Sequence, residues 1–210
     1  MLIRSHNIDA SSDKALWVDP SQIEVSVRSP LKFSKESVIP GDWDLDGKPY
    51  NIHPKYVSVL QHFQQGLEWE DTLLFQRYKA RLQRGGSVRG CITLDALKEN
   101  YQRTVDSLFD DMKKNGFRYP LNANGEPVPL PGIFIGRNGN YLFCDQGNHR
   151  LAIAKLLRLE KIACQPRARH PIWAKLRERI FRLAPDQPVT FLSKRLASHP
   201  DLADLVIEIG

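Results

Sequence analysis

The chain is poor in cysteine, and the cysteines that it has are badly spaced for cross-links. Its three cysteines, Cys91, Cys144 and Cys164, are far apart and form no CxxC pair. The sequence therefore predicts neither a disulfide framework nor a zinc motif. It also lacks an apolar run of about 18 residues, so no membrane-spanning helix is expected. The first residues show no continuous apolar stretch, so we expect no secretory signal and predict a cytoplasmic protein with reduced thiols.

The charge is distributed unevenly along the chain. Lysine and arginine total 30 against 24 aspartate and glutamate, which gives a net charge of +6 over 210 residues. The segment 158–182 holds eight basic and two acidic residues, so its own net charge equals that of the whole chain. A local basic field indicates an anionic partner, either a nucleotide or a nucleic acid. A solvated helix face beside a strand is the alternative interpretation.

Strand patterns predict a small mixed sheet. Residues 16–27 contain β-branched residues that alternate near the end of the stretch, which is typical of a strand. Residues 133–145 predict a β-hairpin, with Asn138 and Gly139 in its turn. A strand is also expected over residues 161–169. Together with the helical segments between them, these strands indicate an α+β fold.

Helical periodicity fills most of the remaining chain. Residues 53–116 contain three expected helices, and Pro54 suits the first position of the first of them. A further short helix is expected from Asn148 to Leu159, and an amphipathic helix from Pro171. We therefore predict a single domain over residues 1–210, with 53–116 as a helical insertion and 171–210 as a C-terminal helical extension.

Polar residues gather where the strand before residue 147 ends and the next helix begins. A helix N-terminus offers unpaired N–H groups and the positive end of a dipole, which together favour an anion. Gly147 allows a phosphate to approach closely, and His149 and Arg150 add donors. Asp145 and Asn148 can accept bonds from a ribose, a hydroxyl group or a metal-bound water. The alternative is a capped helix in which Arg150 pairs with Asp145.

The sequence Gly-Asp-Trp-Asp at 41–44 is a second candidate. In an extended loop, Asp42 and Asp44 would point to the same side. Two carboxylates placed in this way near phosphates can hold Mg²⁺ or activate a hydroxyl nucleophile, and Trp43 can stack a base. The alternative is an acidic surface loop anchored by a buried tryptophan.

The stretch DQGNHRLAIAKLLRLEKIAC resembles the signature of the ParB/sulfiredoxin superfamily, in which a G-x-[HR]-R turn precedes an alanine-rich short helix and a returning strand. The resemblance covers 132–169 well. The segments WVDPSQIEV and VIPGDWD are more loosely similar to the N-terminal strand and loop of that superfamily. The chain also looks like uncharacterised ParB-like proteins with a GDWD loop and an RHxxW ending, here Arg169, His170 and Trp173. The resemblance implies a ParB/sulfiredoxin-like small mixed sheet with flanking helices, to which 53–116 is added.

Members of the superfamily bind ATP, ADP or CTP, so the resemblance implies a nucleotide pocket. Its expected nucleotide-binding residues are Gly147, Asn148, His149, Arg150, Arg167, Arg169, His170 and Trp43. Mg²⁺ is expected at Asp42 and Asp44. Asn148 stands where sulfiredoxins carry their catalytic cysteine, so reduction of sulfinic acid is not expected. The superfamily's free-serine kinases use a carboxylate base, for which the candidates are Asp42, Asp44, Asp145, Glu68 and Glu70.

Two functions of different classes follow. The first is a nucleotide-dependent phosphotransferase or hydrolase that acts on a small molecule, since phosphoryl transfer needs mainly positioning and positive charge. The second is a ParB-like regulator that contacts DNA through the basic segment 158–182. Residues 171–210 show no clear helix-turn-helix pattern, which favours the first. A nuclease, another label within the superfamily, is a third option without a compact metal-nuclease motif to support it.

Overall fold

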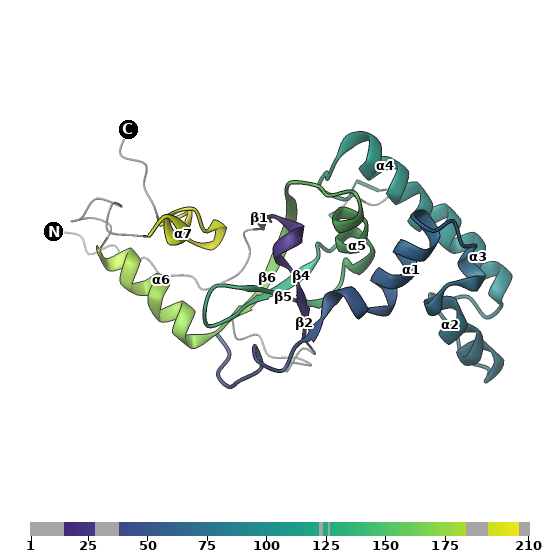
Figure 1. Cartoon of the computed structure of the whole chain (residues 1–210), viewed down its shortest axis with the longest axis horizontal. Coiled ribbons are helices and arrows are strands. Elements are labelled where there is room, and N and C mark those ends of the chain that lie inside the picture. Colours follow the sequence, from purple (N-terminus) through teal and green to yellow (C-terminus); the bar gives the residue numbers. More distant parts are fainter. Residues whose placement is uncertain (1–14, 28–37, 122–123, 126, 184–192, 206–210) are drawn as a thin grey trace.

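The structure is a computed structural model that describes residues 15–27, 38–121, 124–125, 127–183 and 193–205. Figure 1 shows a central sheet with helices α1 to α4 at one end of the molecule and helices α6 and α7 at the other. The predicted α+β class is confirmed. None of the helices that the structure describes is both long enough and apolar enough to cross a membrane.

The described strands form one mixed sheet with the order β1-β6-β4-β5-β2-β3. Strands β4 (Gly132–Ile135) and β5 (Tyr141–Asp145) form the predicted hairpin, and β6 (Ile162–Arg169) runs parallel to β4. Strand β1 (Leu16–Val18) pairs antiparallel with β6 at one edge. At the other edge, β2 (Val25–Ser26) pairs parallel with β5 and antiparallel with β3 (Lys48–Pro49).

The single strand predicted over 16–27 is wrong. The 3₁₀-helix η1 (Pro20–Gln22) interrupts this stretch and separates β1 from β2. The Asp19 carboxylate accepts a bond from the Ser21 N–H at 2.8 Å, and Pro20 starts the helix. An Asp-Pro pair favours this local turn over continued strand pairing. Residues 16–27 therefore supply the edge strand β1 and, toward the other edge, strand β2.

The helical segment 53–116 begins after the short helix η2 (Tyr50–Ile52). It contains α1 (Pro54–Phe63), η3 (Trp69–Asp71), α2 (Leu73–Gln83), α3 (Leu94–Tyr101), η4 (Gln102–Asp106) and α4 (Ser107–Asn115). The last predicted helix of this segment is thus divided, because η4 is a π-helix between α3 and α4. Single π-helical turns inside α-helices occur frequently at functional sites.

The remaining helices follow the sheet. Helix α5 (Asn148–Leu156) lies between β5 and β6, and α6 (Pro171–Leu183) begins directly after β6. The C-terminal extension contains α7 (Lys194–Ala197) and η6 (Pro200–Leu202). These elements agree with the helices predicted from the sequence.

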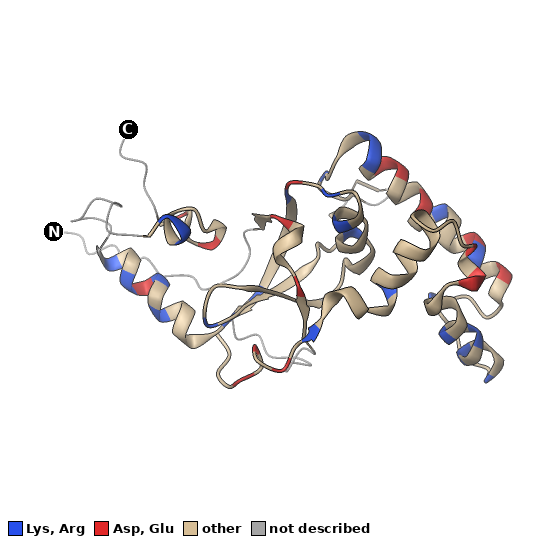
Figure 2. Ribbon diagram, in the orientation of Figure 1, with Lys and Arg blue, Asp and Glu red and all other residues tan. Residues whose placement is uncertain are grey.

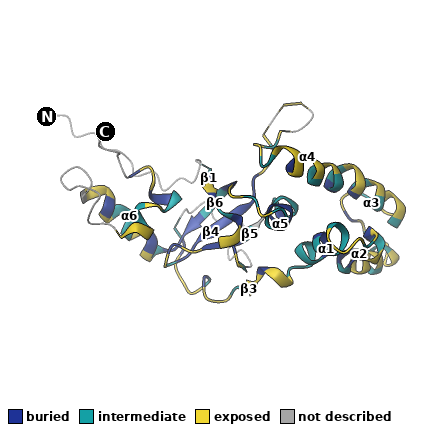
Figure 3. Ribbon diagram, turned by 45° about the horizontal axis from the view of Figure 1, so that its top comes forward, coloured by how far each residue is buried: buried dark blue, intermediate teal, exposed yellow. Residues whose placement is uncertain are grey.

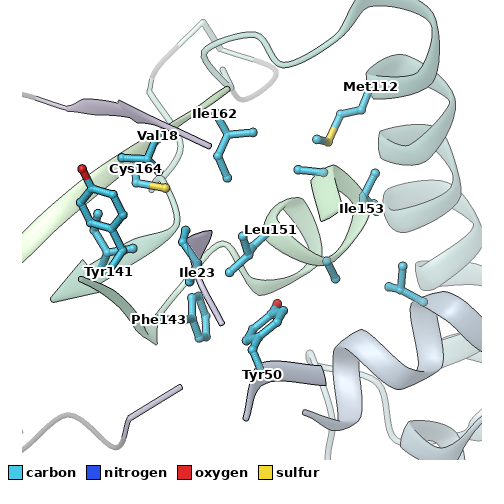
Figure 4. Packing of buried hydrophobic residues seen from close by; sticks show 14 of the residues in the cluster. Val18, Ile23, Tyr50, Met112, Tyr141, Phe143, Leu151, Ile153, Ile162 and Cys164 are labelled. Atoms are coloured by element: carbon cyan, nitrogen blue, oxygen red, sulfur yellow. The ribbon is translucent and has the colours of Figure 1, made fainter. Parts of the chain in front are cut away.

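Strand residues alternate between two hydrophobic clusters on the two faces of the sheet, as the period of two in a β-strand requires. Ile133 and Ile135 face the larger cluster, which also contains residues of α1 to α5, whereas Phe134 faces the smaller one. Figure 4 shows α5 within the larger cluster, with Leu151 and Ile153 on labelled sticks. Figure 3 shows the strands and α5 largely buried. One continuous core therefore joins the helical segment to the sheet.

Candidate functional site

A pocket of about 450 Å³ opens where β5 ends and α5 begins. Its lining comes from the turn between these two elements and from the helical segment 53–116. Residues Gly147, Asn148, His149 and Arg150 all contribute to it, so the predicted phosphate turn lies at a pocket. The volume lies within the usual range for small-ligand sites, about 300–1,000 Å³.

The turn has the backbone conformation that a close approach to a ligand requires. Gln146 and Gly147 both have positive φ, at 32° and 61°. A Cβ atom at Gly147 would lie 2.5 Å from the Pro131 nitrogen and 2.6 Å from its Cα atom, so only glycine fits. A non-glycine residue such as Gln146 in this region of φ carries backbone strain, and such strain clusters at binding sites.

The first turn of α5 presents its N–H groups without a cap. Gly147 occupies the N-cap position, and no side chain there accepts a bond from the helix. The helical ladder begins with the Leu151 N–H, which donates to the Gly147 carbonyl oxygen at 3.0 Å. The N–H groups of Asn148, His149 and Arg150 therefore lack partners within the helix, and the helix dipole adds partial positive charge beside the pocket.

Asn148 has a different role from the one predicted for its side chain. The hydroxyl of Tyr50, just before the helical segment, donates to its Oδ1 at 3.0 Å, and its amide nitrogen lies beside the His53 ring. Asn148 is also buried. Its side chain therefore ties the start of the helical segment to α5 instead of accepting bonds from a ribose. Its backbone N–H, in the first turn of α5, stays without a partner in the helix.

His149 lies inside the pocket wall with unused hydrogen-bonding capacity. Its ring meets Tyr101 edge to face, with centroids 5.4 Å apart. Its Nε2 atom is buried and has no hydrogen-bond partner among the described residues. Burial first, and then the nearby charges of Lys55, Arg89 and Arg150, lower the pKa of His149 to about 3. The ring is therefore neutral at pH 7.

Arg150 is partly buried in the pocket wall. Its Nη1 donates to the Pro129 carbonyl oxygen at 3.3 Å, whereas its buried Nε has no partner in the described structure. Burial lowers the pKa of Arg150. The suggested pair with Asp145 stays a prediction, because the Asp145 side chain lies outside the described part of the chain.

The helical segment contributes two further cations, which the sequence analysis did not single out. Lys55 stands in the first turn of α1, and Arg89 lies between α2 and α3; both line the pocket. Burial, followed by the charge of Arg89, lowers the pKa of Lys55. A basic residue next to a glycine in a loop, here Arg89 and Gly90, was the available sequence signal. This signal is weak, because a basic residue beside a glycine does not by itself indicate a binding site.

Arg89 is held in place by contacts within the helical segment. Its backbone has a positive φ of 51°. Its Nη2 donates to the Thr104 hydroxyl at 3.2 Å, and its guanidinium carbon lies 4.9 Å from the centre of the Tyr101 ring. Thr104 belongs to η4 and also lines the pocket. The π-helix thus places a residue that supports Arg89.

The described residues that line the pocket include no aspartate or glutamate. Three of them are lysine or arginine: Lys55, Arg89 and Arg150. With the helix N-terminus, they make the pocket strongly positive. Such a pocket favours a ligand that carries several negative charges.

The carboxylates of the Gly-Asp-Trp-Asp loop lie elsewhere. Asp44 accepts bonds from the backbone N–H and the Nε of Arg137, both at 2.9 Å, and Asp42 accepts from the Arg137 Nη2 at 2.6 Å. Arg137 belongs to the β4–β5 turn, whereas Gly147 follows the opposite end of β5. Five strand residues separate these ends, a length of roughly 16 Å. The prediction that this loop approaches the phosphate turn is therefore wrong.

The same contacts argue against the predicted Mg²⁺ site. The Arg137 guanidinium already pairs with both carboxylates and offsets part of their charge. The search of the described residues found no group of three or more histidine, cysteine, aspartate or glutamate side chains that could hold a metal ion. Asp42 and Asp44 thus do not fit Mg²⁺.

Trp43 and His170 also have structural contacts. The Trp43 Nε1 donates to the Ile39 carbonyl oxygen at 2.9 Å, and its ring packs against Phe134 in the smaller hydrophobic cluster. His170 accepts a bond from the Ile172 N–H at its Nδ1 atom, which leaves its Nε2 to donate to the Gly41 carbonyl oxygen at 3.1 Å. The predictions of base stacking and of phosphate binding for these residues are therefore wrong.

Of the other predicted residues, Arg167 lies near the pocket. Its Nη2 donates to Oε1 of Gln146, a lining residue, at 3.2 Å. Arg169 is instead buried against Asp201. Glu68 and Glu70 pair with Lys98, at 3.9 Å and 2.7 Å, and neither is part of the pocket lining. Asp145 ends β5 beside the turn, so by backbone position it is the one candidate base at this end of the sheet.

Comparisons of the chain with models of protein families, with curated proteins and with solved structures returned no match. The interpretation of the pocket therefore depends on its own residues.

The new position of Asp44 leads to a prediction that separates stability from binding. Asp44→Asn keeps the size of the side chain but weakens its bonds to Arg137, so the free energy of unfolding should fall by about 1 kcal/mol. Burial raises the pKa of Asp44, whereas the side-chain and backbone bonds from Arg137 lower it. The lowering prevails, so the pKa of Asp44 lies below its ordinary value. The stabilisation should therefore be present at pH values above about 4 and be lost as the pH falls below that.

Urea unfolding at several pH values measures this effect, with Asp46→Asn as an exposed control from the same loop. Nucleotide affinity should be the same in both variants and in the wild type. A selective loss of affinity in Asp44→Asn would return this loop to the binding site.

Proposed function

We propose that this protein binds a nucleotide through its phosphates, in the pocket at the N-terminus of α5. The observation that carries the proposal is a set of three cations, the partly buried Lys55 and Arg150 and the exposed Arg89, around an uncapped helix N-terminus, without an acidic partner among the described lining residues. The buried, unpartnered Nε2 of His149 independently indicates a missing partner at the same place. Buried polar groups without partners are rare and call for a ligand or water.

The order of elements around the pocket supports a ParB/sulfiredoxin-like protein. A strand, a glycine turn, a short helix with buried alanines and a returning strand follow one another, as the resemblance implies. In this proposal the backbone N–H groups of residues 148–150 hold one phosphate, and Arg150 adds a charged donor. The apolar lining residues Val105, Leu108 and Phe143 offer surface for the nucleoside.

The chemistry after binding is a narrower proposal. A phosphotransferase or hydrolase needs a group that activates the nucleophile. Since Asp42, Asp44, Glu68 and Glu70 are held elsewhere, Asp145 is the one predicted carboxylate left for that role. Binding is therefore better supported than catalysis.

The alternative of DNA binding through residues 158–182 has less support. Several charges in this segment are paired with acidic residues: Arg169 with Asp201, Arg177 with Asp204, and Arg182 with Glu178. Figure 2 shows basic and acidic residues side by side on α6. Lys175 and Arg179 are exposed on α6. The other exposed basic residues of the segment that have no acidic partner among the described residues, Arg158 and Lys161, lie in the turn before β6, so these four do not form one stripe along a helix.

A thermal-shift screen of ATP, ADP, CTP and GTP tests the proposal. A ligand that binds only the folded state, at ten times its dissociation constant, should raise the free energy of unfolding by about 1.4 kcal/mol. The midpoint of thermal unfolding should rise with at least one of these nucleotides and not with the corresponding nucleoside. No shift with any nucleotide at millimolar concentration would contradict the proposal.

A further inference from the structure

The pocket has a second cationic side, and we propose that Lys55 and Arg89 form a subsite for an additional phosphate, which makes the ligand a nucleoside di- or triphosphate instead of a monophosphate. This inference rests on the proposed function, because it concerns the same pocket. Lys55 and Arg89 belong to the helical segment 53–116, whereas Arg150 and the α5 N-terminus belong to the β5–α5 turn. Two parts of the chain thus supply positive charge to one space.

The charges of the two sides lie close enough to affect each other and His149. Lys55, Arg89 and Arg150 all lower the pKa of His149, after burial. Arg89 also lowers the pKa of Lys55, again after burial. Like charges held together in a half-buried site destabilise the free protein, and an anion between them relieves this repulsion.

The positive charge of the described lining residues exceeds what a single phosphate group balances. Three lysine or arginine side chains and the partial charge of a helix N-terminus, about +0.5, face the pocket. A terminal phosphate carries about −1.5 to −2 at pH 7. Each further phosphate of a chain adds negative charge, so a di- or triphosphate matches the site better.

Arg89 is placed before any ligand arrives. A pair of backbone bonds between Val88 and Cys91 closes its loop, at 2.9 and 3.0 Å. The Thr104 hydroxyl, which accepts from Arg89, itself donates to the Asn100 carbonyl oxygen at 2.6 Å. The left-handed backbone of Arg89 and the π-helix that carries Thr104 are both uncommon features that converge on this side chain. A side chain held in this way loses little conformational entropy when it binds phosphate.

The test compares phosphate chains of increasing length by isothermal titration calorimetry, at constant ionic strength and without divalent metal. Orthophosphate, pyrophosphate and tripolyphosphate are titrated first, and AMP, ADP and ATP follow. The wild type should bind the di- and triphosphate forms at least tenfold more tightly than the monophosphate form. In Lys55→Gln and Arg89→Gln this preference should shrink by about tenfold, while affinity for the monophosphate form changes by less than about threefold.

Lys79→Gln and Arg103→Gln are matched controls, because both residues are exposed on the same helical segment and neither lines the pocket. They should retain the full preference. An equal loss of affinity for all chain lengths in Lys55→Gln and Arg89→Gln, or an unchanged preference, overturns the second subsite. The proposed function fails separately, if the wild type binds none of the six compounds or if Arg150→Ala leaves every affinity unchanged.

Discussion

Replacing Asp201 with alanine should lower the free energy of unfolding by about 3–5 kcal/mol, the cost of removing one partner of a buried ion pair. Asp201 is fully buried in the 3₁₀-helix η6. It accepts bonds from the Nε of Arg169, at 2.9 Å, and from the Nε1 of Trp173, also at 2.9 Å. Without the carboxylate, a buried guanidinium loses one of its partners and a buried indole N–H loses its acceptor. Urea unfolding followed by circular dichroism measures the change.

Asp204→Ala is the matched control for this prediction. Asp204 pairs with Arg177 at 2.8 Å, but its side chain is 43% exposed. Exposed pairs contribute about 0–1 kcal/mol, so this variant should remain close to the wild type. Asp201→Asn should lie between the two, because an amide oxygen still accepts from Trp173. Equal losses in Asp201→Ala and Asp204→Ala would show that the buried pair does not hold the C-terminal extension on the sheet.

The pairing of Arg169 with Asp201 also shows why the charge analysis of the sequence was incomplete. The count of basic residues in 158–182 was correct, but the acidic residues that neutralise part of it come from further along the chain, at 201 and 204. Sequence spacing gives no information about such pairs. Asp44 and Arg137 are a second example, since 93 positions separate them in the sequence. Local composition therefore overestimated the basic field, and the resemblance placed two carboxylates at the wrong end of the sheet.

Local patterns predicted the elements better than they predicted the site. The hairpin, α5 and the helix after Pro171 depend on turn residues and periodicity within a few positions, and all were confirmed. The strand over 16–27 failed because one Asp-Pro pair outweighed its β-branched residues. The glycine turn was found because its conformational demand is local to Gly147. Lys55 and Arg89 were missed because only the packing of the helical segment brings them to that turn.

Three His-Pro pairs in the sequence mark helix starts at which the histidine ring is the cap. His53, His170 and His199 each precede a proline that starts a helix. In each case Nδ1 of the ring accepts the N–H two residues further on, at 3.1 to 3.2 Å. The prolines at 54 and 171 were interpreted as helix starts, but the histidines were not recognised as their caps. In His170 the capping bond occupies Nδ1 and the Gly41 carbonyl oxygen occupies Nε2, so both ring nitrogens already have partners within the protein.

Arg150→Ala should weaken nucleotide binding by about 1.5–3 kcal/mol, the range for hydrogen bonds to charged groups. The unpaired Nε and the neighbouring N–H groups of α5 place this side chain where a phosphate would contact both. Calorimetric titration of the best nucleotide from the thermal-shift screen measures the change. Arg158→Ala is the matched control, because it removes an exposed arginine from beyond the opposite end of the same helix. Its affinity should equal that of the wild type.

The stability of the Arg150→Ala variant distinguishes a binding residue from a structural one. Burial lowers the pKa of Arg150, and its one bond in the described structure is to the Pro129 carbonyl oxygen, at 3.3 Å. The free protein therefore bears the cost of a partly buried charge that the ligand is expected to compensate. Removing that charge should leave the free energy of unfolding unchanged or slightly higher, even though nucleotide binding is weakened. A large loss of stability together with unchanged affinity would instead indicate that Arg150 pairs within the protein, as the capped-helix alternative with Asp145 requires.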